Sequence, residues 1–95
     1  MGVRLIVQHH VKDYEQWNPV FDEHAKVRRQ HGGTGHRLNR SLDDRNTLVL
    51  AVEFETAEGA RAFAADPSLK EAMDRAGVDS APNIYLCEEV EQITY

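Results

Sequence analysis

Cysteine, long apolar runs and clusters of basic residues are nearly absent from this 95-residue chain. Cys87 is the only cysteine, so no disulfide can form within the chain and no cysteine-rich zinc site is possible. No apolar run approaches the ~20 residues that a membrane-spanning helix needs, and the N-terminus lacks the apolar core of a signal peptide. The formal net charge is −5, which disfavours nucleic acid as a partner. We therefore expect a cytoplasmic protein that binds neither membranes nor nucleic acid.

Motifs for covalent catalysis, phosphate binding and metal binding are absent as well. There is no GxSxG nucleophile motif. The glycine-rich segment 31–35 follows a predicted helix instead of opening one, which argues against a phosphate-binding loop. The five histidines form neither an HExxH motif nor a pair spaced four residues apart. We therefore predict no metal site and no tightly bound cofactor.

The hydrophobic pattern predicts strands and helices in the order β-α-β-β-α-β. Alternation places Leu5, Val7 and His9 on one face of the first strand. The first helix carries a stripe with steps of three and four residues that runs from Tyr14 to His31. The expected elements are a strand at 3–11, a helix at 14–30, strands at 36–42 and 47–53, a broken helix at 57–76 and a strand at 84–93.

Capping residues mark the ends of the predicted helices. Asp13, Thr56 and Asp66 are candidate N-caps, and the last of them is followed by a proline suited to the first helical turn. Gly77 closes the second helical region, since glycine adopts the left-handed closing conformation at little cost. Pro19 interrupts the first helix, so residues 14–18 could form a separate short turn.

This order of elements predicts an α+β fold in a single domain spanning residues 1–95. Two split βαβ halves form a ferredoxin-like plait, in which helices cover one face of a four-stranded antiparallel sheet. The first and third strands also carry apolar residues on the other face, including Ile6, Val49 and Ala51. An apolar open face must be covered. The simplest cover is a second copy of the chain, which predicts a homodimer.

Several motifs make the chain similar to a known superfamily. They are H-x-V-x-D-Y-x-x-W at 9–17, P-V-F-D at 19–22, R-x-x-G at 29–32, D-D-x-N at 43–46 and A-F-A-x-x-P-x-L-x-x-A-M-x-x-A-G-V at 62–78. The sequence resembles small proteins of the dimeric α/β-barrel superfamily that are described as antibiotic biosynthesis monooxygenase-like or cyclase-like. The resemblance covers nearly the whole chain.

The resemblance implies a homodimer whose two sheets face each other as a barrel. It also implies a pocket in each subunit, between the sheet and the helices. Some members of the superfamily oxygenate planar polyphenols with dioxygen and neither metal nor flavin. Others degrade haem, cyclise polyketides or isomerise lactones. The haem-degrading arrangement is not expected here, because Trp17, Asn18 and His24 cluster on one predicted helix.

The candidate site consists of polar and aromatic residues that share the predicted inner face. His9 is the candidate catalytic residue, because an imidazole of ordinary pKa can take a phenolic proton. The candidate substrate-binding residues are Tyr14, Trp17, Phe21, His24, Met73 and Glu88, the last assigned by its alternation with Ile84 and Leu86.

Each of these assignments has a structural alternative. His9 could instead cap the following helix or bond a backbone carbonyl. Trp17 and Phe21 could be ordinary core residues, and His24 and Arg28 could form only a polar edge of their helix. His10 has the opposite alternation from His9, so we expect it to have a structural role.

The leading functional hypothesis is a small homodimeric enzyme that oxygenates or cyclises an aromatic or polyketide-like molecule without a cofactor. A second hypothesis is a non-catalytic dimer that binds a small molecule or serves in a stress response. A third is a structural dimer whose slot is filled by side chains.

Overall fold

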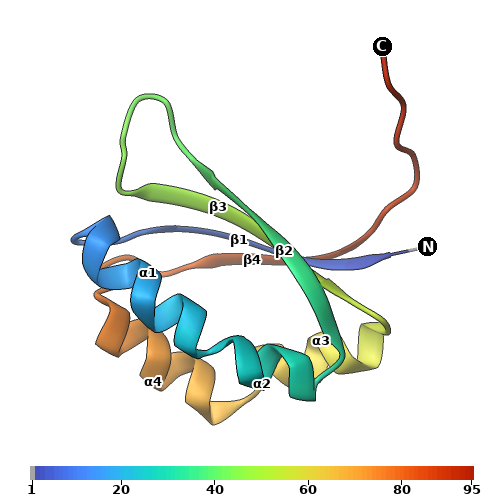
Figure 1. The fold of residues 1–95 in the computed structure, drawn as a ribbon, viewed down its shortest axis with the longest axis horizontal. Coiled ribbons are helices and arrows are strands. Elements are labelled where there is room, and N and C mark those ends of the chain that lie inside the picture. Colours follow the sequence, from blue (N-terminus) through green and yellow to red (C-terminus); the bar gives the residue numbers. More distant parts are fainter. Residues whose placement is uncertain (1) are drawn as a thin grey trace.

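The computed structural model describes residues 2–95 of the chain. The strands form one sheet in the order β2-β3-β1-β4, and all neighbouring strands are antiparallel. Figure 1 shows the helices on one face of this sheet. The predicted ferredoxin-like plait is therefore confirmed, with each crossover split into two helices. The elements are β1 (Val3–His10), α1 (Tyr14–Glu23), α2 (Ala25–Gln30), β2 (Gly33–Arg40), β3 (Thr47–Phe54), α3 (Ala57–Ala64), α4 (Pro67–Ala76) and β4 (Asn83–Glu88).

The predicted helix caps are confirmed. The Asp13 side chain accepts a hydrogen bond from the N–H of Glu15 at the start of α1. The Thr56 side chain accepts one from the N–H of Gly59 at the start of α3. Gly77 ends α4 in the left-handed conformation, with φ of 82°. These groups satisfy backbone atoms that have no partner inside the helices themselves.

The break in the first helical region does not occur at Pro19. Pro19 lies within α1, which continues to Glu23 before His24 separates it from α2. Proline has no N–H, so one backbone hydrogen bond of α1 is missing. Trp17 and Phe21 stack across this turn with ring centroids 4.7 Å apart, and this packing supports the helix where the bond is lost. A separate short turn at 14–18 is therefore wrong.

The hydrophobic core lies between the sheet and the helices. The register of β1 and β3 aligns Leu5 with Val52 and His9 with Leu48, so the alternation predicted the inward face of β1 correctly. Alternation also predicted the inward side chains of β3. The buried hydrophobic cluster consists of Leu5, Val7, Val11, Trp17, Leu48, Leu50, Val52, Phe54, Ala60, Phe63 and Ala76.

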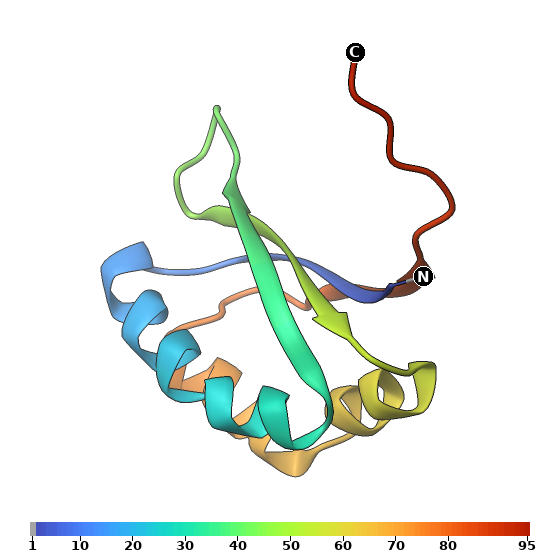
Figure 2. The same ribbon diagram turned by 45° about the vertical axis from the view of Figure 1, so that its right-hand side comes forward.

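The other face of the sheet carries no helix within residues 2–95 (Figure 2). Val49 and Tyr85 on this face are 37% and 57% exposed. Ile6 and Ala51 beside them are half-buried. Large apolar side chains therefore project from the face that the helices leave open, as the sequence predicted.

The last strand is shorter than the predicted 84–93. β4 ends at Glu88, which pairs with Val3 at the beginning of β1. Beyond this pair one more backbone hydrogen bond follows, from the N–H of Glu89 to the carbonyl oxygen of Gly2 at 3.0 Å. The segment 90–95 then leads away from the sheet in Figure 1.

Asp66 connects the end of α2 to the start of α4. Its Oδ2 lies 2.9 Å from Nε2 of His31, and its Oδ1 accepts a hydrogen bond of 2.8 Å from the N–H of Ser68. The contact with His31, followed by the hydrogen bonds from Ser68, lowers the pKa of Asp66 from 3.8 to about 2. Ionised Asp66 therefore stabilises the fold above pH 3.8, and this contribution is lost as the pH falls toward about 2.

We expect Asp66→Asn to flatten the acid limb of the stability curve. The amide oxygen can still accept from the Ser68 N–H, but the variant has no carboxylate to protonate. Thermal unfolding is followed by circular dichroism from about pH 6 to about pH 2. As the pH falls over this range, the melting temperature should decrease less in the variant than in the wild type. Asp43→Asn in the exposed turn between β2 and β3 is the control, and its melting temperature should change with pH as that of the wild type does. Identical slopes for the Asp66 variant and the wild type would contradict this assignment.

Candidate functional site

An apolar cavity lies between the sheet and the helices. Its volume is about 50 Å³. The inward side chains of β1 and β3 form its floor, and α1, α2 and α4 contribute most of its walls. A cavity of about 150 Å³ is known to hold a benzene ring. A flat ligand therefore enters this one only when wall side chains such as Leu69 and Met73 move.

His9 is the polar group at the floor of this cavity. The residue is only 3% exposed, and neither ring nitrogen has a hydrogen-bond partner among residues 2–95. Burial lowers the pKa of His9, so the imidazole is neutral at pH 7. Leaving a buried polar group unsatisfied costs about 1–3 kcal/mol. The alternative in which His9 caps a helix or bonds a carbonyl is wrong, because Asp13 caps α1 and His9 has no such bond.

Trp17 and Phe21 form an aromatic wall beside His9. Their rings are stacked, with centroids 4.7 Å apart and planes 17° apart. The His9 ring lies nearly perpendicular to Trp17, with centroids 5.8 Å apart and planes 82° apart. Both aromatic residues line the cavity, and Trp17 is also a buried member of the core. The two interpretations of this stripe, core and cavity wall, therefore both apply.

His24 lines the cavity from the junction of α1 and α2, but its hydrogen-bonding capacity is partly used. Its Nε2 lies 3.0 Å from Oγ of Ser68 at the start of α4. Burial, and secondarily the charge of Arg28, lowers the pKa of His24. Met73 lines the cavity from α4. Of the histidines on the cavity, His9 is therefore the one whose nitrogens are both free.

Arg28 is a cavity residue that the sequence analysis left undecided. It is 5% exposed, and its guanidinium carbon lies 3.8 Å from the centroid of the Phe21 ring. Burial lowers the pKa of Arg28. Its place on the stripe that also holds Phe21 and His24 was the one signal in the sequence, and an arginine on a helix is usually exposed.

Several solved structures have the same overall fold as this chain. SnoaB, a cofactor-independent oxygenase from Streptomyces nogalater, has a TM-score of 0.77 at 18% identity, covering 99% of this chain and 98% of that one. The chain has the fold of the antibiotic biosynthesis monooxygenases. A monooxygenase from the gene ActVA-Orf6 of Streptomyces coelicolor, in complex with nanaomycin D, has a TM-score of 0.70 at 16% identity, covering 99% and 92%.

A third solved structure with a similar fold is Rv0793 from Mycobacterium tuberculosis. Its TM-score is 0.71 at 12% identity, and the match covers 99% of this chain and 100% of that one. No protein-family model matches the chain, and no curated protein is significantly similar to it in sequence. At these identities the likeness establishes the fold, so the chemistry of the site has to follow from the residues of this chain.

Within this fold two of the proposed site residues lie outside the cavity. The hydroxyl of Tyr14 accepts a hydrogen bond of 3.3 Å from Asn18, and its ring lies beside Trp17 but is not part of the cavity lining. Glu88 has the predicted inward alternation, because it pairs with Val3. Its side chain is exposed nonetheless, since this last pair of the ladder lies at the end of the sheet. The other five proposed residues, His9, Trp17, Phe21, His24 and Met73, all line the cavity.

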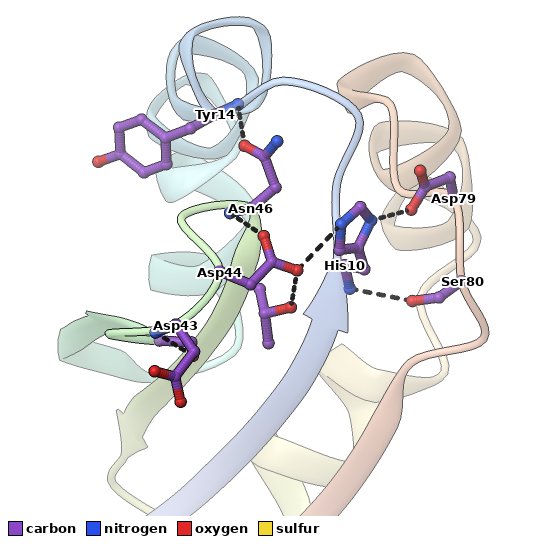
Figure 3. Close-up of polar contacts among 9 residues, drawn as sticks. His10, Tyr14, Asp43, Asp44, Asn46, Asp79 and Ser80 are labelled. Carbon is purple, nitrogen blue, oxygen red and sulfur yellow. Dashed lines mark hydrogen bonds and ion pairs between the residues drawn. The ribbon is translucent and has the colours of Figure 1, made fainter.

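His10 has the structural role expected for it. Figure 3 shows its ring between Asp44 and Asp79, which come from the loops after β2 and α4. Nδ1 lies 2.7 Å from Asp79, and Nε2 lies 3.4 Å from Asp44. The hydrogen bond with Asp79, followed by the charges of the two carboxylates, raises the pKa of His10. The backbone N–H of His10 also donates to Ser80 Oγ at 2.9 Å, so this histidine ties two loops to β1.

Neither a metal site nor a membrane span is seen in the part of the chain that the structure describes. Within residues 2–95, no three His, Cys, Asp or Glu side chains are grouped so that they could hold a metal ion. None of the helices found there is long and apolar enough to cross a bilayer.

Proposed function

We propose that this protein is a homodimeric enzyme that oxygenates or cyclises a flat aromatic or polyketide-like molecule without metal or flavin. The observation that carries the proposal is the His9 side chain, which is buried on an apolar cavity with both ring nitrogens unpartnered. A ligand with an acidic hydroxyl would supply the missing partner. The aromatic faces of Trp17 and Phe21 would hold its rings.

His9 would act as the general base. Its neutral imidazole accepts the proton of a phenolic or enolic O–H at one ring nitrogen, which leaves an electron-rich anion beside an imidazolium. The anion offsets the cost of a charged imidazole in an apolar cavity. Such an anion can transfer an electron to dioxygen, and conversion of a CH₂ group and O₂ to C=O and H₂O balances without a further reductant.

A second copy of the chain would cover the open face of the sheet. Val49 and Tyr85 remain exposed there, and single chains rarely leave large apolar patches uncovered. A symmetric dimer buries this face in both copies. Light scattering is expected to give twice the chain mass of 10.8 kDa, and a monomer at micromolar concentration would contradict the dimer.

We expect flat aromatic ligands to quench Trp17, the only tryptophan of the chain, in a saturable manner. The probes are anthrones, hydroquinones, flavonoids and haem, with oxygen consumption recorded in the same cuvette. Saturable quenching with oxygen uptake supports the enzyme. Quenching without uptake supports a binding protein, which is the second hypothesis. A flat response across the panel would mean that side chains fill the slot, as in the third hypothesis.

Two leucine variants locate the binding in the cavity. Ala72 lines the cavity from α4, so Ala72→Leu fills space that a ligand needs and should abolish the quenching. Ala62 is exposed on α3, so Ala62→Leu is the matched control and should bind as the wild type does. Equal quenching in both variants would place the ligand elsewhere. Circular dichroism checks that both variants are folded.

A further inference from the structure

Arg28 is a buried cation that lies near the carboxylate of Asp22 without forming an ion pair with it. Only 5% of the residue is exposed, and its side chain forms no ion pair with a carboxylate within residues 2–95. Its guanidinium lies over the Phe21 ring instead. Arginine remains charged even when it is buried. A buried charge without a partner destabilises the fold, so its presence on a cavity points to a ligand that carries the opposite charge.

Arg28 and His9 contact different members of one stacked aromatic pair, Phe21 and Trp17. The rings of His9 and Trp17 are nearly perpendicular, with centroids 5.8 Å apart. Trp17 stacks on Phe21 at 4.7 Å, and the Arg28 guanidinium carbon is 3.8 Å from the Phe21 centroid. All four residues line the cavity. A molecule lying along this wall would therefore meet a neutral imidazole at one end and a cation at the other.

A second hollow on the surface meets the cavity at Arg28. It has a volume of about 210 Å³ and lies between α1, α2 and the start of β2. Arg28 and Val52 line both spaces. Asp22, Arg29 and His36 line the outer hollow, where the two arginines outnumber the single carboxylate. Arg28 therefore borders both the outer hollow, where an anionic group would approach from solvent, and the cavity beside the aromatic wall.

We propose that the ligand of this protein is an elongated aromatic carboxylic acid whose carboxylate pairs with Arg28. Its rings lie along Trp17 and Phe21, and its reacting position lies at His9. The inference rests on the proposed function, because it names the residue that binds the other end of the ligand whose reacting end lies at His9. Arg28 is then a binding residue that selects anionic substrates and takes no part in the proton transfer.

Calorimetric titration with naphthalene-2-carboxylate and its neutral amide tests this assignment. The two probes have the same ring system and differ in charge at one end. The wild type should bind the acid about tenfold or more tightly than the amide, because hydrogen bonds to an ionised group are the stronger ones. Arg28→Met should lose this preference and still bind the amide. Lys26→Met, which removes an exposed positive charge from the same helix but lies outside both hollows, should keep the preference.

The possible results separate this inference from the proposed function. Equal binding of the two probes by the wild type would overturn the role of Arg28 and leave an aromatic-binding cavity intact. Failure of the wild type to bind either probe would overturn both. Preference for the acid that survives in Arg28→Met would place the anion at another residue. If Arg28→Met does not fold, Arg28→Gln is the second variant, and the comparison of acid with amide in the wild type already decides whether an anion site exists.

Discussion

Replacing His9 with leucine is expected to stabilise the fold and abolish turnover. Leucine fills about the same volume and needs no hydrogen bond, whereas both nitrogens of His9 are buried without partners. Removing that cost should raise the free energy of unfolding by about 1–3 kcal/mol. If His9 is the general base, as proposed, its loss should reduce turnover by ~10²–10⁴. A residue whose removal improves stability and destroys activity is retained for its chemistry.

The neighbouring residue provides the matched control for this experiment. His10 has two carboxylate partners, so His10→Leu should lower stability in urea unfolding where His9→Leu raises it. The contributions of His9 and His10 to stability should also depend on pH in opposite directions. The buried, neutral His9 weakens the fold as the pH falls below 6.5, because the unfolded chain binds the proton more readily. His10 stabilises the fold below pH 6.5 and loses this effect as the pH rises through its raised pKa.

Two results would contradict this assignment of His9. A less stable His9→Leu variant would mean that the imidazole has a partner in solution. Unchanged turnover on a substrate found by the Trp17 titration would mean that another group takes the proton.

Replacing Gly59 with alanine is expected to destabilise the protein, although alanine is the better helix former. In an exposed helix the change would stabilise by up to about 1 kcal/mol. In α3, however, a Cβ at this position would overlap the backbone carbonyl oxygen of His31 at the end of α2. It would also stand 3.2 Å from Oγ1 of the capping Thr56. Separating the two helices should cost about 1–3 kcal/mol net.

Denaturant unfolding of a pair of alanine variants measures this effect. At Gly35, in β2, an added Cβ meets no atom within 4 Å, so Gly35→Ala is the control and should leave stability unchanged or slightly higher. Equal or greater stability of Gly59→Ala than of the wild type would show that α2 and α3 are not in close contact at His31.

Local sequence patterns determined the elements and their faces. The alternation of Leu5, Val7 and His9 is a property of neighbouring residues, so it placed His9 on the inner face before any contact was known. The caps at Asp13 and Thr56 are equally local, since each bonds an N–H two or three residues ahead. Hence the order of elements and the side of the sheet on which a site could lie followed from the sequence.

Contacts between distant segments decided what each candidate residue can do. His24 has a partner because Ser68 arrives from α4, and His10 has partners because two loops meet at the end of β1. His9 has none, and a sequence cannot show that no group reaches a side chain. The burial of Arg28 was hidden for the same reason, because an arginine on a helix is usually exposed unless other elements cover it. Hydrogen bonding and charge pairing depend on the packing of segments far apart in the chain, so the tertiary structure alone separated the unpartnered histidine, His9, from the structural one, His10.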